Sequence, residues 1–74
     1  MADEPPHDTW FIAQRIAWIV ESVQIFGHIN REHICRKFAV TMAIASTDLA
    51  KVMDRYPDLM TYSRSTKRYE RNGD

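Results

Sequence analysis

The apolar residues between positions 10 and 26 repeat with the period of an α-helix. Six of them fall on one helical stripe: Ile12, Ile16, Ile19, Val20, Val23 and Phe26. Asp8 or Thr9 is suited to cap the start of this helix, and Gly27 is suited to end it in a left-handed conformation. The pattern therefore predicts one amphipathic helix over residues 10–26.

A short helix is predicted next, after a β-compatible stretch at residues 28–30. Asn30 has the side chain of an N-cap residue. Ile34 and Phe38 are four residues apart and would face the core from one side of this helix. It is expected to end near Ala39.

A third helix is predicted from Thr41, its N-cap, to about Tyr56. It should end there because the residue before Pro57 disfavours the α region. Its inward stripe is expected to comprise Ala45, Leu49, Val52 and Tyr56. Two helices joined by a turn of this length are typical of a helix-turn-helix.

The pattern changes to a period of two after Asp58, which is typical of strands. Residues 59–62 and 67–70 are predicted to form a hairpin around a polar turn at residues 63–66. The expected fold class is mainly α with a small β-hairpin, a winged helix-turn-helix of three helices and a two- to three-stranded wing. The domain is expected to span residues 9–70, with a disordered acidic N-terminus at 1–8 and a frayed C-terminus at 71–74.

The composition limits the classes of protein that the chain can belong to. Its 74 residues suit one small domain, and a single cysteine allows no intrachain disulfide. No apolar run reaches membrane-spanning length and the first residues are not those of a signal peptide, so no membrane partner and a cytoplasmic location are expected. The net charge is zero, but residues 31–69 hold eight Lys and Arg against four Asp and Glu. This half of the chain therefore carries a net charge of +4, which suits a DNA-binding face.

Motifs in residues 27–69 resemble the N-terminal winged-helix domains of bacterial WYL-domain transcriptional regulators, including those associated with phage-defence loci. The matching residues are Gly27, Ile29, Arg31, Phe38, Val40, Thr41, Ala45, Ser46, Asp48, Leu49, Leu59, Tyr62, Lys67, Arg68 and Tyr69. The resemblance implies sequence-specific binding of double-stranded DNA by a small regulator of phage or mobile-element type. The sequence ends directly after the wing, so the ligand-sensing and dimerisation regions of those regulators are not carried over.

The DNA-contacting residues are expected on the third helix, at the start of the second helix and in the wing. The recognition helix would lie in the major groove, and the wing would lie on the backbone or in the minor groove. The candidates are Asn30, Arg31, Thr41, Met42, Ala43, Ser46, Thr47, Lys51, Arg64, Lys67 and Arg68. Asp48 is expected to be structural and to pair with Arg31, Arg36 or Arg55, since a carboxylate beside phosphates is unfavourable.

The first helix also carries a second apolar stripe, formed by Phe11, Trp18 and Ile25 with Trp10 nearby. Two interpretations of this stripe are open. The rest of the domain covers it, or it forms an interface with a second copy or with a protein partner. The latter underlies the alternative function, a winged-helix protein-interaction module without DNA binding.

Catalytic and metal-binding sites are not expected. His28, His33 and Cys35 are close in sequence, but their spacing is not a usual zinc pattern and a fourth ligand is not obvious. The chain shows no nucleophilic triad, no phosphate-binding Gly-rich loop and no paired acid and base carboxylates. We therefore expect no enzyme activity, no cofactor and no small-molecule ligand.

Overall fold

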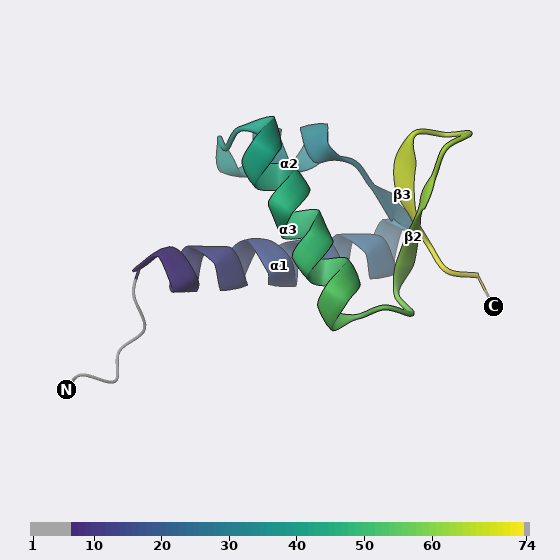
Figure 1. Cartoon of the computed structure of the whole chain (residues 1–74), viewed down its shortest axis with the longest axis horizontal. Coiled ribbons are helices and arrows are strands. Elements are labelled where there is room, and N and C mark those ends of the chain that lie inside the picture. The colour runs from purple at the N-terminus through teal and green to yellow at the C-terminus, as the bar shows by residue number, and fades with distance from the viewer. Residues whose placement is uncertain (1–6, 74) are drawn as a thin grey trace.

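The longest element is helix α1 (His7–Phe26), which runs along the horizontal long axis of the domain in Figure 1. The computed structural model describes residues 7–73, with the side chains from Thr9 onward. The expectation for residues 1–6 lies outside the described residues. Because α1 begins at His7, Asp8 and Thr9 lie within its first turn, and the expectation that one of them caps the helix is wrong.

Gly27 ends α1 as expected, with a φ of 85° that only glycine adopts readily. Its N–H donates to the carbonyl of Val23 at 2.9 Å, and strand β1 (His28–Ile29) follows at once. Phe26 was expected in the core but is 71% exposed. The chain reverses directly after it, and Ile29, which is 1% exposed, occupies the core at this end of the helix.

Helix α2 (Arg31–Phe38) is held at its start by a reciprocal capping box. The Asn30 side chain accepts from the N–H of His33 at 3.0 Å, and Nδ1 of His33 accepts from the N–H of Asn30 at 3.3 Å. At the other end, Ala39 takes a left-handed conformation with a φ of 56°. This residue makes the sharp turn into the next helix.

Helix α3 (Met42–Arg55) begins at the N-cap predicted from the sequence, since Oγ1 of Thr41 accepts from the N–H of Ile44 at 3.2 Å. Its end differs from the prediction. Tyr56 is the C-cap residue, outside the helical repeat, and is 42% exposed rather than part of the inward stripe.

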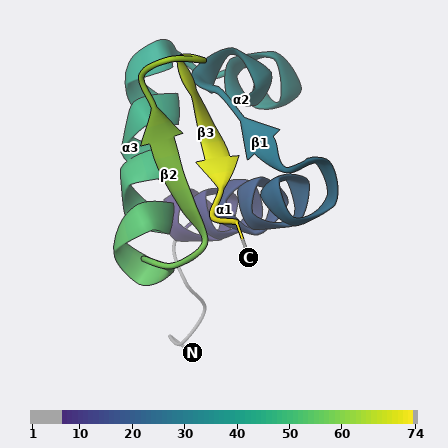
Figure 2. The same cartoon turned by 90° about the vertical axis from the view of Figure 1, so that its right-hand side faces the viewer.

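Strands β2 (Met60–Ser63) and β3 (Arg68–Arg71) form the wing, and β1 joins them in an antiparallel sheet of order β1-β3-β2 (Figure 2). Tyr62 pairs with Tyr69 in β2 and β3, and Ile29 pairs with Tyr69 from β1. Each wing strand lies one residue later than predicted. Lys67 therefore belongs to the turn, where its φ is 59°.

The sheet continues past the boundary expected at residue 70. The N–H of Arg71 donates to the carbonyl of Gly27 at 2.8 Å, and its guanidinium donates to the carbonyl of Gln24 at 2.6 Å. The N–H of Asn72 donates to the carbonyl of Leu59 at 2.9 Å. Residues 71 and 72 are thus hydrogen-bonded to the body of the domain and do not start a frayed end.

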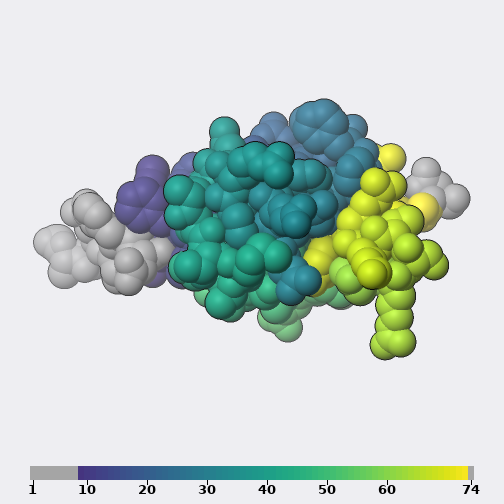
Figure 3. All heavy atoms as spheres, turned by 90° about the horizontal axis from the view of Figure 1, so that it is seen from above, coloured from purple at the N-terminus to yellow at the C-terminus, as the bar shows by residue number. Residues whose placement is uncertain are grey.

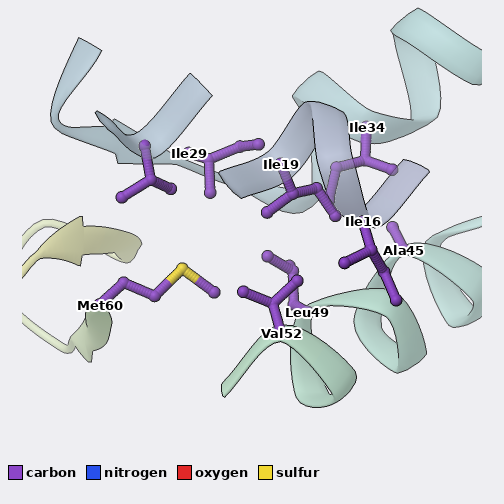
Figure 4. Close-up of a cluster of buried hydrophobic side chains, with 9 residues drawn as sticks. Ile16, Ile19, Ile29, Ile34, Ala45, Leu49, Val52 and Met60 are labelled. Atoms are coloured by element: carbon purple, nitrogen blue, oxygen red, sulfur yellow. The ribbon is translucent and has the colours of Figure 1, made fainter. Parts of the chain in front are cut away.

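All three helices and two strands contribute to one hydrophobic core, eight of whose nine residues are labelled in Figure 4. These residues are Ile16, Ile19, Val23, Ile29, Ile34, Ala45, Leu49, Val52 and Met60. Within residues 7–73, three helices and a three-stranded sheet around this core confirm the predicted winged helix-turn-helix.

Candidate nucleic-acid interface

An ion pair between α1 and α3 fixes the position of the candidate recognition helix. Nε of Arg15 lies 2.5 Å from Oδ2 of Asp48, and a second guanidinium nitrogen lies 3.3 Å from Oδ1. The side chain of Asp48 is 1% exposed and that of Arg15 is 14% exposed. The prediction that Asp48 is structural agrees with this burial, but its predicted partners were wrong. The partner is in α1, 33 positions earlier in the chain.

Small side chains occupy the outward face of α3. Ala43, Thr47 and Ala50 are exposed and fall on one side of the helix, opposite the buried Ala45 and Leu49. The hydroxyl of Thr47 donates to the carbonyl of Ala43 at 3.0 Å, so its remaining lone pairs and methyl group face outward. A helix face without bulky side chains is able to approach base edges closely in a major groove.

The start of α2 and the turn of the wing meet at the N-terminal end of α3. Asn30, Arg31, Glu32, Met42 and Lys67 line one hollow there. Figure 3 looks down on this side of the molecule and shows α2 and α3 beside the projecting wing. Two cationic side chains from distant parts of the sequence therefore border the beginning of the recognition helix.

Arg31 also contacts α3 directly, because its guanidinium donates to Oγ of Ser46 at 3.3 Å. Ser46 is half-buried and lies on the side of α3 that faces α2. Thr41 and Met42, at the first turn of α3, are exposed. Met42 receives a contact from Sγ of Cys35 at 3.4 Å.

The wing presents its cations in different ways. Arg64 is exposed in the turn between β2 and β3. Lys67 is also exposed, and it is the left-handed residue that closes this turn. Arg68 instead donates to Glu70 at 3.1 Å on the outer face of β3. Hydrogen bonds from Thr66 and from Arg68 hold the pKa of the Glu70 carboxyl below its ordinary value of 4.5. Arg68 is thus already partnered by a carboxylate, whereas Arg64 and Lys67 form no ion pair within the described residues.

Lys51 lies apart from the other candidates, on the side of α3 that faces α1. It shares a hollow with Ala43, Thr47 and Arg15. The expected DNA-binding residues therefore extend across the outward face of α3, from Arg31 on the α2 side to Lys51 on the α1 side.

Arg15 was not singled out from the sequence. The signal that could have indicated a buried partner is the position of Arg15, which lies next to the apolar residues Ile12 and Ile16 on the predicted first helix. Sequence patterns within α1 do not indicate which acidic residue of α3 it meets.

The second apolar stripe of α1 is covered only at its centre. The Trp18 ring packs edge-to-face on Phe38 of α2, with 5.4 Å between ring centroids. Phe11 and Ile25, toward the two ends of the helix, are 51% and 63% exposed. Trp10 lies beside Phe11 with 5.0 Å between ring centroids. The rest of the domain therefore covers the centre of this stripe and leaves side chains toward its two ends exposed.

The structure brings His28 and His33 to 6.1 Å between ring centroids, and His33 is used in the capping box of α2. Within the described residues no group of three or more His, Cys, Asp and Glu side chains could hold a metal ion. None of the helices described is long and apolar enough to cross a membrane.

The domain is a winged helix-turn-helix. It has three helices around one core, a capped third helix with small outward side chains, and a three-stranded sheet that includes the wing. The chain matches the model of the BrxR transcriptional regulator winged helix-turn-helix domain over residues 12–74 and belongs to this family. The match confirms the resemblance to the winged-helix domains of bacterial transcriptional regulators. The matched family is one of transcriptional regulators and not of enzymes. A comparison with curated proteins found no match.

Proposed function

We propose that this protein binds double-stranded DNA in a sequence-specific manner, as a small cytoplasmic transcriptional regulator of phage or mobile-element type. The observation that carries this proposal is the convergence of Arg31, Lys67 and the first turn of α3 around one hollow. In the proposed complex α3 enters the major groove, with Thr41, Met42, Ala43, Ser46 and Thr47 near the bases. Asn30 and Arg31 hold a phosphate at the start of α2, where the helix dipole adds to the arginine charge.

The wing is proposed to contact the flanking backbone or the minor groove. Arg64 extends from the turn, and Lys67 stands between the wing and α3. Lys51 reaches the backbone on the opposite side of the groove. Arg68 contributes less in this arrangement because Glu70 competes with phosphate for its guanidinium.

The proposal is tested with the charge reversal Lys67→Glu and its matched control Arg55→Glu. Both residues are exposed and each change alters the net charge equally, but only Lys67 lines the hollow beside α3. Lys67→Glu should weaken binding to duplex DNA by about tenfold or more. Arg55→Glu should change it only about twofold, through the overall charge. Equal effects of the two variants would show that the hollow is not part of the DNA interface.

A second candidate function is a winged-helix module that binds a protein and no DNA. Trp10, Ile25 and Phe26 favour it, because they are exposed large apolar side chains on α1. The double charge-reversal variant with Lys51→Glu and Arg64→Glu separates the two functions. It should abolish DNA binding if the first function is correct and should leave binding of a protein partner intact.

A further inference from the structure

The first nine residues of α3 hold few groups that could read a base by hydrogen bonding. Residues 42–50 contain no Asn, Gln, Arg or Lys. These are the side chains that form the common hydrogen-bonded pairs with purine edges in the major groove. Within this stretch only Ser46, Thr47 and Asp48 carry a hydroxyl or charged side chain. Recognition by hydrogen bonds from this part of α3 therefore depends on these three residues.

Each of these three side chains already has a hydrogen-bond partner within the domain. Both carboxylate oxygens of Asp48 accept from the Arg15 guanidinium, and the Asp48 side chain is 1% exposed. The Thr47 hydroxyl donates to the backbone carbonyl four residues before it, at 3.0 Å. Oγ of Ser46, a half-buried residue, accepts from Arg31 at 3.3 Å. The proton of the Thr47 hydroxyl and the carboxylate of Asp48 are therefore not available to a base.

The outward side of α3 instead presents methyl groups. Ala43, Thr47 and Ala50 are exposed there, Met42 is 45% exposed at the start of the helix, and Asp54 follows one turn after Ala50. From residue 43 to residue 50 a helix rises about 10 Å, the length of about three base pairs. Thymine carries a methyl group in the major groove, and alanine and the threonine methyl group contact it there. This part of α3 is therefore complementary to thymine methyl groups.

We infer that α3 recognises its DNA site through the 5-methyl groups of thymines, by apolar contacts with Ala43, Thr47 and Ala50, and not by hydrogen bonds to purines. The inference rests on the proposed function and names the bases that the same interface prefers. The cations Arg31 and Lys67 beside α3 hold the phosphates, which supplies affinity without sequence preference. The preferred site accordingly has thymines within the three or so base pairs opposite α3.

Replacement of thymine by deoxyuridine tests the inference, because uracil lacks only the methyl group and keeps every hydrogen-bonding group of the base pair. The duplexes that the full chain binds most tightly are first selected from a random pool, and each thymine is then replaced in turn. Replacement at the positions that the selection fixes should weaken binding about fourfold for each methyl group removed. Replacement in the flanking sequence is the control and should change the affinity by less than about 1.5-fold.

The outcomes of this experiment distinguish the inference from the proposed function. Selective binding that uracil leaves unchanged at every position would overturn the inference, while DNA binding itself would stand. A selected site without thymines would have the same meaning. Absence of binding to any duplex at low salt would contradict the proposed function, and the inference would fall with it.

Two substitutions of the exposed Thr47 separate the role of its methyl group from that of its hydroxyl. Thr47→Val keeps a methyl group and should keep the preference for thymine over uracil to within about twofold. Thr47→Ser keeps the hydroxyl and should abolish the roughly fourfold preference at one position of the site. Thr66→Ser is the matched control, the same change at an exposed threonine of the wing turn, and should leave the preference unaltered. Selectivity lost in Thr47→Val but kept in Thr47→Ser would show that the hydroxyl reads the base and would overturn the inference.

Discussion

Asp48 is a charged residue that belongs to the core rather than to the surface of the recognition helix. It is buried against Arg15, and both of its oxygens receive a hydrogen bond from the guanidinium. Burying a carboxylate is costly unless it is paired and hydrogen-bonded. The pair therefore fixes where α3 crosses α1. Through that crossing it also fixes the position of Ala43 and Thr47 on the outward face of α3.

Asp48→Asn should lower the free energy of unfolding by about 3 kcal/mol, at the lower end of what loss of one partner from a buried ion pair costs, because Arg15 keeps some solvent contact. Denaturant unfolding would measure the change. Asp54→Asn is the control, because Asp54 is exposed on the same helix and should alter stability by no more than about 0.5 kcal/mol. A loss for Asp48→Asn as small as that of the control would show that the ion pair does not hold α3 in place.

The Glu70 carboxylate is expected to make the stability of the wing depend on pH. Its pKa is lowered by hydrogen bonds from Thr66 and Arg68, so the folded state favours the charged carboxylate. The stabilisation is present above the ordinary value of 4.5 and is lost as the pH falls through the lowered folded pKa. Unfolding of the wild type and Glu70→Gln, compared between neutral pH and pH values below 4.5, should show a stability difference that disappears in acid. A difference that stays constant with pH would contradict this role of the carboxylate.

At the scale of elements, the turn between α2 and α3 carries a residue poorly suited to its conformation. Ala39 adopts a left-handed φ of 56°, which is unfavourable for residues with a Cβ atom. Ala39→Gly should raise the free energy of unfolding by about 1 kcal/mol. The matched change Ala50→Gly, at an exposed position inside α3, should lower it by about 1 kcal/mol. Denaturant unfolding that gives the same sign for both variants would contradict the left-handed turn.

Three helix boundaries set by local chemistry could be predicted from the sequence, whereas the start of α1 lies earlier than the cap expected at Asp8 or Thr9. Asn30, Thr41 and Gly27 act through hydrogen bonds and backbone preferences within a few residues, and the structure confirms all three. Tyr56 and Phe26 were wrongly predicted to be buried, because the apolar spacing of each helix continues in the sequence beyond the point where the chain leaves the helix axis. Each is at an end of its helix and is exposed.

Contacts between distant elements could not be predicted in the same way. The partner of Asp48 depends on the crossing of α1 and α3, and the hollow that joins Arg31 to Lys67 depends on how the wing folds back. The bounds of both wing strands were predicted one residue too early for a related reason. Its turn uses a left-handed Lys67, which has no side-chain signature of such a conformation. The DNA-contacting residues remain predictions.

At the scale of the whole molecule, a net charge of zero conceals an uneven distribution. Asp3, Glu4 and Asp8 stand at the start of the sequence, while Arg31, Arg64 and Lys67 lie around the start of α3 and the wing. The proposed DNA-binding face is therefore basic although the chain as a whole carries no net charge.

The most direct test of DNA binding is the affinity of the full chain for duplex DNA at several salt concentrations. The proposed interface offers five cations, Arg31, Lys51, Arg64, Lys67 and Arg68, of which Arg68 is shared with Glu70. The logarithm of the association constant should fall linearly with the logarithm of salt concentration, with a slope of about −3 to −5. Absence of binding at the lowest salt, or a slope near zero, would contradict the account and favour the protein-interaction module.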